Sequence, residues 1–321
     1  MERARSILDR LSSELGPIDI SKQKQRRLDA IELVRGREGD TRSHPLLFGS
    51  RPFLLCGLPL KKPPQGTLLH KRRNGHFVLQ VCGHPQYGLP FGQDRLIPLW
   101  VATRAVRQKA REITFSSGAE ILDEFGLPPD GPHYRRLVAG FKRIFASTIF
   151  FGTENMLNSA AVWDCSRLCF FERIRLWTRE QRANESDVST RQNTVVLSEA
   201  FWAEVRAHPI PVNRDIVRAL ANAPGALDFY MWLSWRTFGT TRPSRVPLFG
   251  EMGLSAQLGA GEYMRDRDFR RTLVRWLATV RNFWPDCPIE FSSDGAMLHI
   301  RPLRSFHRPA LLSPFPPLIQ N

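Results

Sequence analysis

Residues 264–283 read MRDRDFRRTLVRWLATVRNF, and residues 133–147 read HYRRLVAGFKRIFAS. In the later stretch, apolar side chains recur at helical spacing: Phe269, Leu273, Leu277 and Val280. The same spacing appears in the earlier stretch: Leu137, Phe141, Ile144 and Phe145. A stripe at this period predicts a helix with one buried face. Both stretches are therefore predicted to be long helices that each cover a hydrophobic core.

The opposite side of each predicted helix is basic. In the earlier helix, Arg135 and Lys142 lie two turns apart, as do Arg136 and Arg143. The later helix carries an i, i+4, i+8 ladder of arginines with one more beside it: Arg267, Arg271, Arg275 and Arg270. Like charges at this spacing repel by about 0.2–0.5 kcal/mol per pair in an isolated helix. A helix gains nothing from such a ladder unless an anionic partner lies against it, so these eight residues are the predicted contacts with that partner. A solvated face partly neutralised by Asp266 and Asp268 is the alternative.

The elements around these two helices occur in the same order in both halves of the chain. Each half reads as helix, short strand, helix, long basic helix, and then a hairpin or meander. Two pairs of short segments echo one another, 124–127 with 251–254 and 141–147 with 273–279. A helix-turn-helix followed by a hairpin is typical of a winged helix, whose second helix enters the major groove. We therefore expect an α+β fold of two tandem winged-helix domains related by a weak internal duplication.

Composition shifts along the chain suggest five segments. Residues 1–75 are expected to be a mixed-charge helical and extended segment, rich in Pro, Gly and Lys near its end. Residues 76–178 and 193–304 are the two predicted winged-helix domains, and residues 305–321 are a C-terminal tail. Residues 179–192 are polar with almost nothing to bury, which favours a linker, although a long loop inside one domain would look similar.

The overall charge favours a polyanionic partner. There are 46 Lys and Arg residues against 31 Asp and Glu, which gives a formal net charge of +15. Only seven of the basic residues are Lys. Arginine binds phosphates and guanine edges in a forked geometry that lysine cannot match. Double-stranded DNA is therefore the expected partner, and a basic surface that binds nothing is the alternative.

Several classes of protein lack support in the sequence. The five cysteines include no second close pair that could complete a zinc site, so we expect reduced thiols and no metal. The dipeptide Gly-Lys of a P-loop does not occur, and no two histidines are two residues apart, as a rolling-circle nickase would need. The start of the chain has no apolar signal region, and no run of eighteen apolar residues follows. The sequence thus predicts a cytoplasmic, non-enzymatic protein with no cofactor and no membrane contact.

Several spaced segments share a pattern with known proteins: YGLPFGQDR at 87–95, residues 104–107 and 141–147, the block 200–212, and residues 226–233. Together they cover about residues 76–304 and resemble plasmid-encoded RepA replication initiators. The resemblance implies a protein that binds repeats (iterons) at a plasmid origin and helps to open the duplex. It also implies recruitment of the host initiator and replicative helicase, and a possible homodimer that represses its own gene. A repressor without initiator activity is the alternative, and a nuclease or primase is the third hypothesis.

The resemblance does not itself assign base contacts. The clearest motif, residues 87–95, is expected to shape the first domain rather than to touch bases. The eight predicted DNA contacts therefore depend on the helical faces and not on the family.

Overall fold

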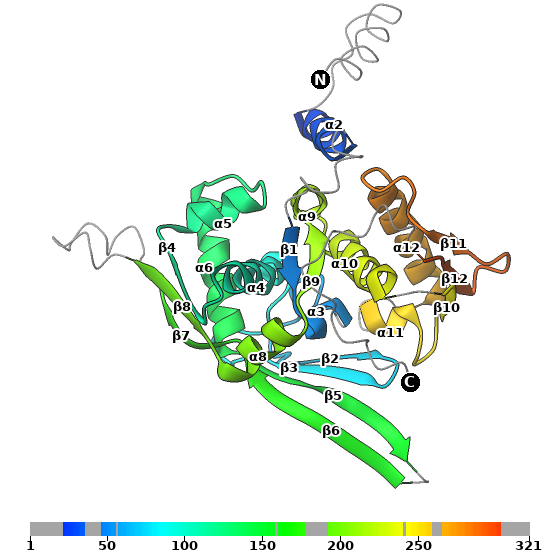
Figure 1. The fold of residues 1–321 in the computed structure, drawn as a ribbon, viewed down its shortest axis with the longest axis horizontal. Coiled ribbons are helices and arrows are strands. Elements are labelled where there is room, and N and C mark those ends of the chain that lie inside the picture. The colour runs from blue at the N-terminus through cyan, green and yellow to red at the C-terminus, as the bar shows by residue number, and fades with distance from the viewer. Residues whose placement is uncertain are drawn as a thin grey trace, which may run out of the picture.

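The computed structural model describes residues 22–35, 46–55, 57–157, 160–176, 192–239, 242–258 and 265–302. Helices and strands are mixed along the chain, so the predicted α+β class is confirmed. Figure 1 shows two lobes, one around α4, α5 and α6 and one around α11 and α12, with α10 and a short two-stranded ribbon between them.

The first lobe contains three helices and a three-stranded antiparallel sheet. The helices are α4 (Leu96–Gln108), α5 (Gly118–Glu124) and α6 (Gly131–Ala146). The strands are β4 (Glu112–Phe115), β7 (Phe171–Arg175) and β8 (Asn193–Leu197), in the spatial order β4-β8-β7. The first strand of this lobe thus pairs with its last.

The second lobe repeats this connectivity. Its helices are α10 (Pro224–Gly239), α11 (Leu254–Leu258) and α12 (Asp266–Arg281). Its strands are β10 (Ser244–Pro247), β11 (Ile289–Phe291) and β12 (Met297–Ile300), in the order β10-β12-β11. The short strand and the final hairpin that the sequence predicts in this half of the chain are both present. The matching strand order supports the internal duplication more directly than the sequence echoes do.

A long hairpin interrupts the first lobe between α6 and β7. Strands β5 (Thr148–Leu157) and β6 (Ala160–Cys169) pair with each other along their whole length. They extend a sheet with β2 (Leu69–Asn74) and β3 (Phe77–Cys82) in the order β2-β3-β5-β6. Figure 1 shows this hairpin reaching away from the first lobe toward the side of the molecule where α11 lies.

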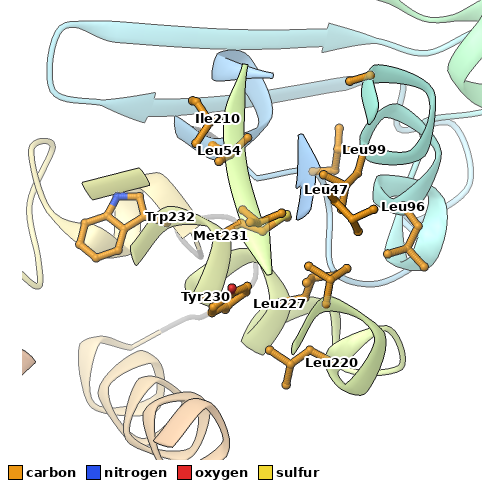
Figure 2. Close-up of a cluster of buried hydrophobic side chains, with 14 of the residues drawn as sticks. Leu47, Leu54, Leu96, Leu99, Ile210, Leu220, Leu227, Tyr230, Met231 and Trp232 are labelled. Carbon is orange, nitrogen blue, oxygen red and sulfur yellow. The ribbon is translucent and has the colours of Figure 1, made fainter. Parts of the chain in front are cut away.

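The centre of the molecule joins segments far apart in the sequence. Strand β1 (Leu46–Gly49) pairs with β9 (Ile210–Asn213), and α3 (Arg51–Leu55) follows β1 directly. Helices α8 (Glu199–Ala207) and α9 (Arg214–Leu220) flank β9, and α2 (Lys22–Arg35) packs against α9. Figure 2 shows side chains of these strands meeting those of α4 and α10 in one continuous core: Leu47, Ile210, Leu96, Leu99, Leu227 and Met231.

Two predicted segment limits are wrong. Strands β7 and β8 pair with each other, so the predicted linker at 179–192 connects two strands of one sheet instead of two domains. A polar hairpin loop and a linker have the same composition, which is why the sequence did not separate them. The predicted N-terminal segment 1–75 contains β1, α3 and the whole of β2, and Leu47 and Leu54 within it are buried in the core. The predicted tail at 305–321 lies outside the described residues.

One of the two pairs of similar segments does not occupy equivalent positions in the two lobes. Residues 124–127 end α5, whereas residues 251–254 lead into α11, so these two segments are not equivalent positions. Whether 76–178 and 193–304 fold independently stays a prediction, although strand pairing crosses the boundary between them.

The packing of α10 on α12 gives a test of the second lobe. A methyl group at Gly225 would overlap the indole ring of Trp276 on α12, because the two helices approach closely there. We expect Gly225→Ala to lower the free energy of unfolding by about 1–3 kcal/mol, the usual range for overpacking. The matched control is Gly131→Ala in the first turn of α6, where the nearest atom to the new methyl is Arg135 Nη1 at 3.6 Å.

Chemical denaturation of both variants measures the difference. Gly131→Ala should stay within about 0.5 kcal/mol of the parent, because the helix preference of alanine is offset by the restriction that Pro132 places on the backbone of the residue before it. Equal stability of the two variants would contradict the described packing of α10 on α12.

Candidate nucleic-acid interface

Helix α12 has the two faces that the sequence predicts. Its apolar stripe is fully buried: Phe269, Leu273, Leu277 and Val280. Asp266 and Asp268 occupy the first turn and Arg281 the last, where their charges complement the helix dipole. This placement gives the two carboxylates a role in helix formation that does not depend on the arginine ladder.

The arginine ladder of α12 lies open to solvent. Arg267 and Arg271 have side chains 68% and 73% exposed, and both approach one carboxylate of Asp268, at 4.0 and 3.9 Å. Arg275 is also exposed and donates from Nη2 to Thr272 Oγ1 at 2.9 Å. Exposed pairs at such distances contribute about 0–1 kcal/mol. The neutralisation by Asp268 is therefore loose, and the face stays cationic and accessible.

Arg270 differs from the other three arginines of α12. Its Nη2 donates to the carbonyl oxygen of Asp294, at 2.8 Å, in the turn between β11 and β12. The next residue, Gly295, has a φ of +64° and leaves no room for a side chain beside the Arg270 guanidinium. Arg270, predicted as a DNA contact, thus fastens the hairpin to the helix in this structure.

Hydrogen bonds to carboxylates fix the start of α6 and the turn before β12. Asp130 caps α6 by accepting from the backbone N–H of His133 at 2.9 Å, and this bond lowers the pKa of the Asp130 carboxyl. In the turn, the backbone N–H of Ala296 lowers the pKa of Asp294 in the same way. Both carboxylates are therefore negatively charged at neutral pH, beside the basic faces of α6 and α12 respectively.

Helix α6 presents a smaller basic face than predicted. Gly140, Phe141 and Ile144 are buried, and Arg135 and Lys142 are exposed. Phe145 is 38% exposed, so its predicted place in the core is wrong. The helix ends one residue later, at Ala146.

The second basic pair of α6 turns toward residues 91–95, which we call the junction segment. Arg136 is exposed but donates from Nη1 to Gln93 Oε1 at 3.3 Å. Arg143 donates from Nε and Nη2 to the two carboxylate oxygens of Asp94, at 2.6 and 2.9 Å. The Arg143 guanidinium also lies 4.6 Å from the ring centroid of Phe91.

The prediction that Arg143 lies on an open face is therefore wrong. The side chains of Arg143 and Asp94 are only 13% and 4% exposed. The sequence explains the fit, because residue 140 is glycine: a methyl group there would stand 2.5 Å from Asp94 Oδ1. Arg143 serves the structure of the first lobe and is not retained as a DNA contact.

The junction segment also reaches the second lobe. Arg95 forms a buried ion pair through Nη1 with Asp228 of α10, and both side chains are 3% exposed. Three further N–H groups of Arg95 donate as well: Nε bonds Gly92 O at 2.7 Å, and Nη2 bonds Pro59 O at 2.9 Å and Leu58 O at 3.1 Å. Asp228 was not identified from the sequence as a partner of this segment. One signal was available: Asp94 and Arg95 are adjacent opposite charges directly before the apolar helix α4, which indicates a buried junction.

Among the described residues, no group of three or more His, Cys, Asp and Glu side chains is placed to hold a metal ion. No helix within the described ranges combines the length and apolar character needed to cross a bilayer.

The ion pair of Arg143 gives a direct test of its assigned role. Arg143→Ala should lower the free energy of unfolding by about 3–5 kcal/mol, because it leaves the buried Asp94 carboxylate without its partner. Arg135→Ala, on the exposed face of the same helix, should stay within about 0.5 kcal/mol of the parent. Urea denaturation compares the two, and a loss no larger for Arg143→Ala than for Arg135→Ala would refute the structural role.

Comparison with known proteins adds two findings. Residues 160–246, from β6 to β10, match the family model described as plasmid encoded RepA protein. A crystal structure of domains 2 and 3 of RctB, as a selenomethionine derivative, is similar in fold. The TM-score is 0.51 at 14% identity, over 76% of this chain and 94% of that chain. A second crystal structure of RctB domains 2–3 gives a TM-score of 0.48 at 14% identity, over 76% and 95%.

The comparison with curated proteins finds no match. The family match includes the blocks 200–212 and 226–233, on which the sequence resemblance partly rests, but not the motif at 87–95. At 14% identity the RctB likeness concerns the fold alone. The match over residues 160–246 thus confirms the resemblance of this chain to the plasmid-encoded RepA replication initiators.

Proposed function

We propose that this chain is a plasmid replication initiator that binds repeated origin DNA sequence-specifically, with α12 as its main reading helix. In this proposal it helps to open the origin and recruits the host initiator and replicative helicase, without enzymatic activity of its own. The family match supports the initiator role. The observation that carries the DNA contact is the open arginine ladder of α12, backed by a fully buried apolar stripe.

The arrangement of each lobe supports a winged-helix interpretation. In both lobes a helix, a strand and two further helices precede a hairpin whose second strand pairs with that first strand. In helix-turn-helix proteins the second helix of the pair lies in the major groove while the first crosses the backbone. On this interpretation α12 and α6 are the groove helices, and the hairpins β11–β12 and β7–β8 are the wings.

The chemistry of the α12 face fits base edges and phosphates. A guanidinium can donate two hydrogen bonds to guanine O6 and N7, or bind a phosphate in a forked geometry. Thr272, which is buried, restricts the Arg275 guanidinium through its hydroxyl, so less side-chain freedom is lost when that arginine binds. When Arg267 and Arg271 bind DNA, they lose only their weak ion pairs with Asp268.

Helix α6 is proposed to have a lesser share of the contact. Arg143 is committed to Asp94, and Arg136 lies beside Gln93, which leaves Arg135 and Lys142 on the open face. Phosphate contacts of this kind fix register and orientation without reading sequence. We therefore propose that the first lobe positions the protein on the duplex and that the second lobe reads it. A homodimer stays a proposal that rests on the family resemblance.

Arginine substitutions on α12 test the reading face. We expect Arg271→Ala and Arg275→Ala each to weaken specific binding by about 1–3 kcal/mol, the range of a lost base-edge contact. Arg206→Ala on α8 removes the same charge from an exposed arginine of another helix and is the matched control. Titration of duplex DNA flanking the gene of this protein measures all three, and unchanged affinity in both α12 variants would remove the site assignment.

Salt dependence tests the size of the electrostatic contact. Two basic lobes that meet about six to ten phosphates should lose about 10³–10⁵ in affinity between 50 and 200 mM salt, because binding releases condensed counterions. Binding isotherms over that range give the slope, and a flat response is incompatible with the proposed footprint.

A minimal plasmid separates the initiator from a repressor. If the gene and its flanking repeats support replication of a plasmid that carries no other initiator, the proposal holds. Failure to replicate together with normal binding to the repeats would favour a DNA-binding repressor, because a repressor needs the same DNA contacts as an initiator.

A further inference from the structure

An apolar side chain stands in the middle of the arginine face of α12. Val274 is 48% exposed. At 100° per residue it projects about 20° from Arg267 and about 60° from Arg271, and Ala278, one turn later, projects between these arginines. Val274 and Ala278 are both exposed, so they form a short apolar strip along the centre of the face, with guanidinium groups beside it.

Core packing does not explain Val274, because its side chain is 48% exposed and projects about 60° away from Leu277, the nearest residue of the buried stripe. Helix formation does not explain it either, since a β-branched residue has lower helix propensity than alanine or arginine. Two neighbouring arginines are held to the side: Arg270 by the carbonyl of Asp294, and Arg275 by the hydroxyl of Thr272. The Val274 side chain is therefore left uncovered between them.

The major groove offers one apolar group to such a strip. Thymine alone carries a C5-methyl group there, and small apolar side chains make contact with it. We propose that Val274, with Ala278 beside it, contacts thymine methyl groups and so determines sequence preference at positions that the arginines do not read. This inference rests on the proposed function, because it needs α12 in the major groove. The flanking guanidinium groups supply the charge complementarity that would hold DNA against the strip.

The test removes the methyl group from the DNA. Wild-type protein is titrated with the duplex that it protects in its own flanking DNA, and then with duplexes in which single thymines are replaced by deoxyuridine. Deoxyuridine pairs as thymine does and lacks only the C5-methyl. At one or more positions we expect about a fourfold loss of affinity, which corresponds to ~0.8 kcal/mol for one buried methyl-sized group. Val274→Ala should bind the thymine and deoxyuridine duplexes with nearly equal affinity at that position.

Met252→Ala is the matched control, since Met252 is 50% exposed and lies outside α12. It should keep the fourfold discrimination. Tight, salt-dependent binding by wild type without any loss on deoxyuridine would overturn this inference and leave the proposed function standing. So would a Val274→Ala variant that still discriminates as strongly as wild type. Failure of the wild type to bind any duplex specifically would overturn the proposed function and this inference together.

Discussion

The buried ion pair between Arg95 and Asp228 is the constraint on which the arrangement of the two lobes depends. A charge removed from water is tolerated only where its partners are nearly complete, and Arg95 has Asp228 and three backbone carbonyls around it. The preceding residue, Asp94, holds α6 through Arg143. Two consecutive residues therefore tie the basic helix of the first lobe to α10, against which α12 packs. This junction sets the separation between α6 and α12.

The two lobes share one connectivity but use their basic helices differently. In α12 three arginines face solvent, while in α6 one arginine is bound within the junction and another lies beside it. This division is consistent with a duplication in which one copy kept an open basic face, while part of the basic face of the other copy became the attachment between the lobes. The inserted hairpin β5–β6 adds a second difference, because the second lobe passes directly from α12 to its hairpin.

The spacing of apolar residues predicted the helices and strands. The roles of individual side chains and the pairing of distant strands depend on contacts between residues far apart in the sequence. The stripes of α6 and α12, the strand at 244–247 and the final hairpin follow from spacing within one element. The role of Arg143 could not be predicted in this way, because its partner Asp94 is 49 residues away. The same holds for β1, which pairs with β9 from the other half of the chain, and for β7 and β8, because the sequence between them has the composition of a linker. The open arginines of α12 were predictable because exposure follows from the opposite, buried stripe.

A hydroxyl-radical footprint of the purified chain on the proposed repeated origin DNA tests the central claim most directly. Since the junction fixes α6 relative to α12, the account predicts two protected segments at each repeat, with the same spacing at every copy. A single protected segment, or a spacing that varies from one copy to the next, would contradict the claim that one fixed pair of related helices grips the duplex.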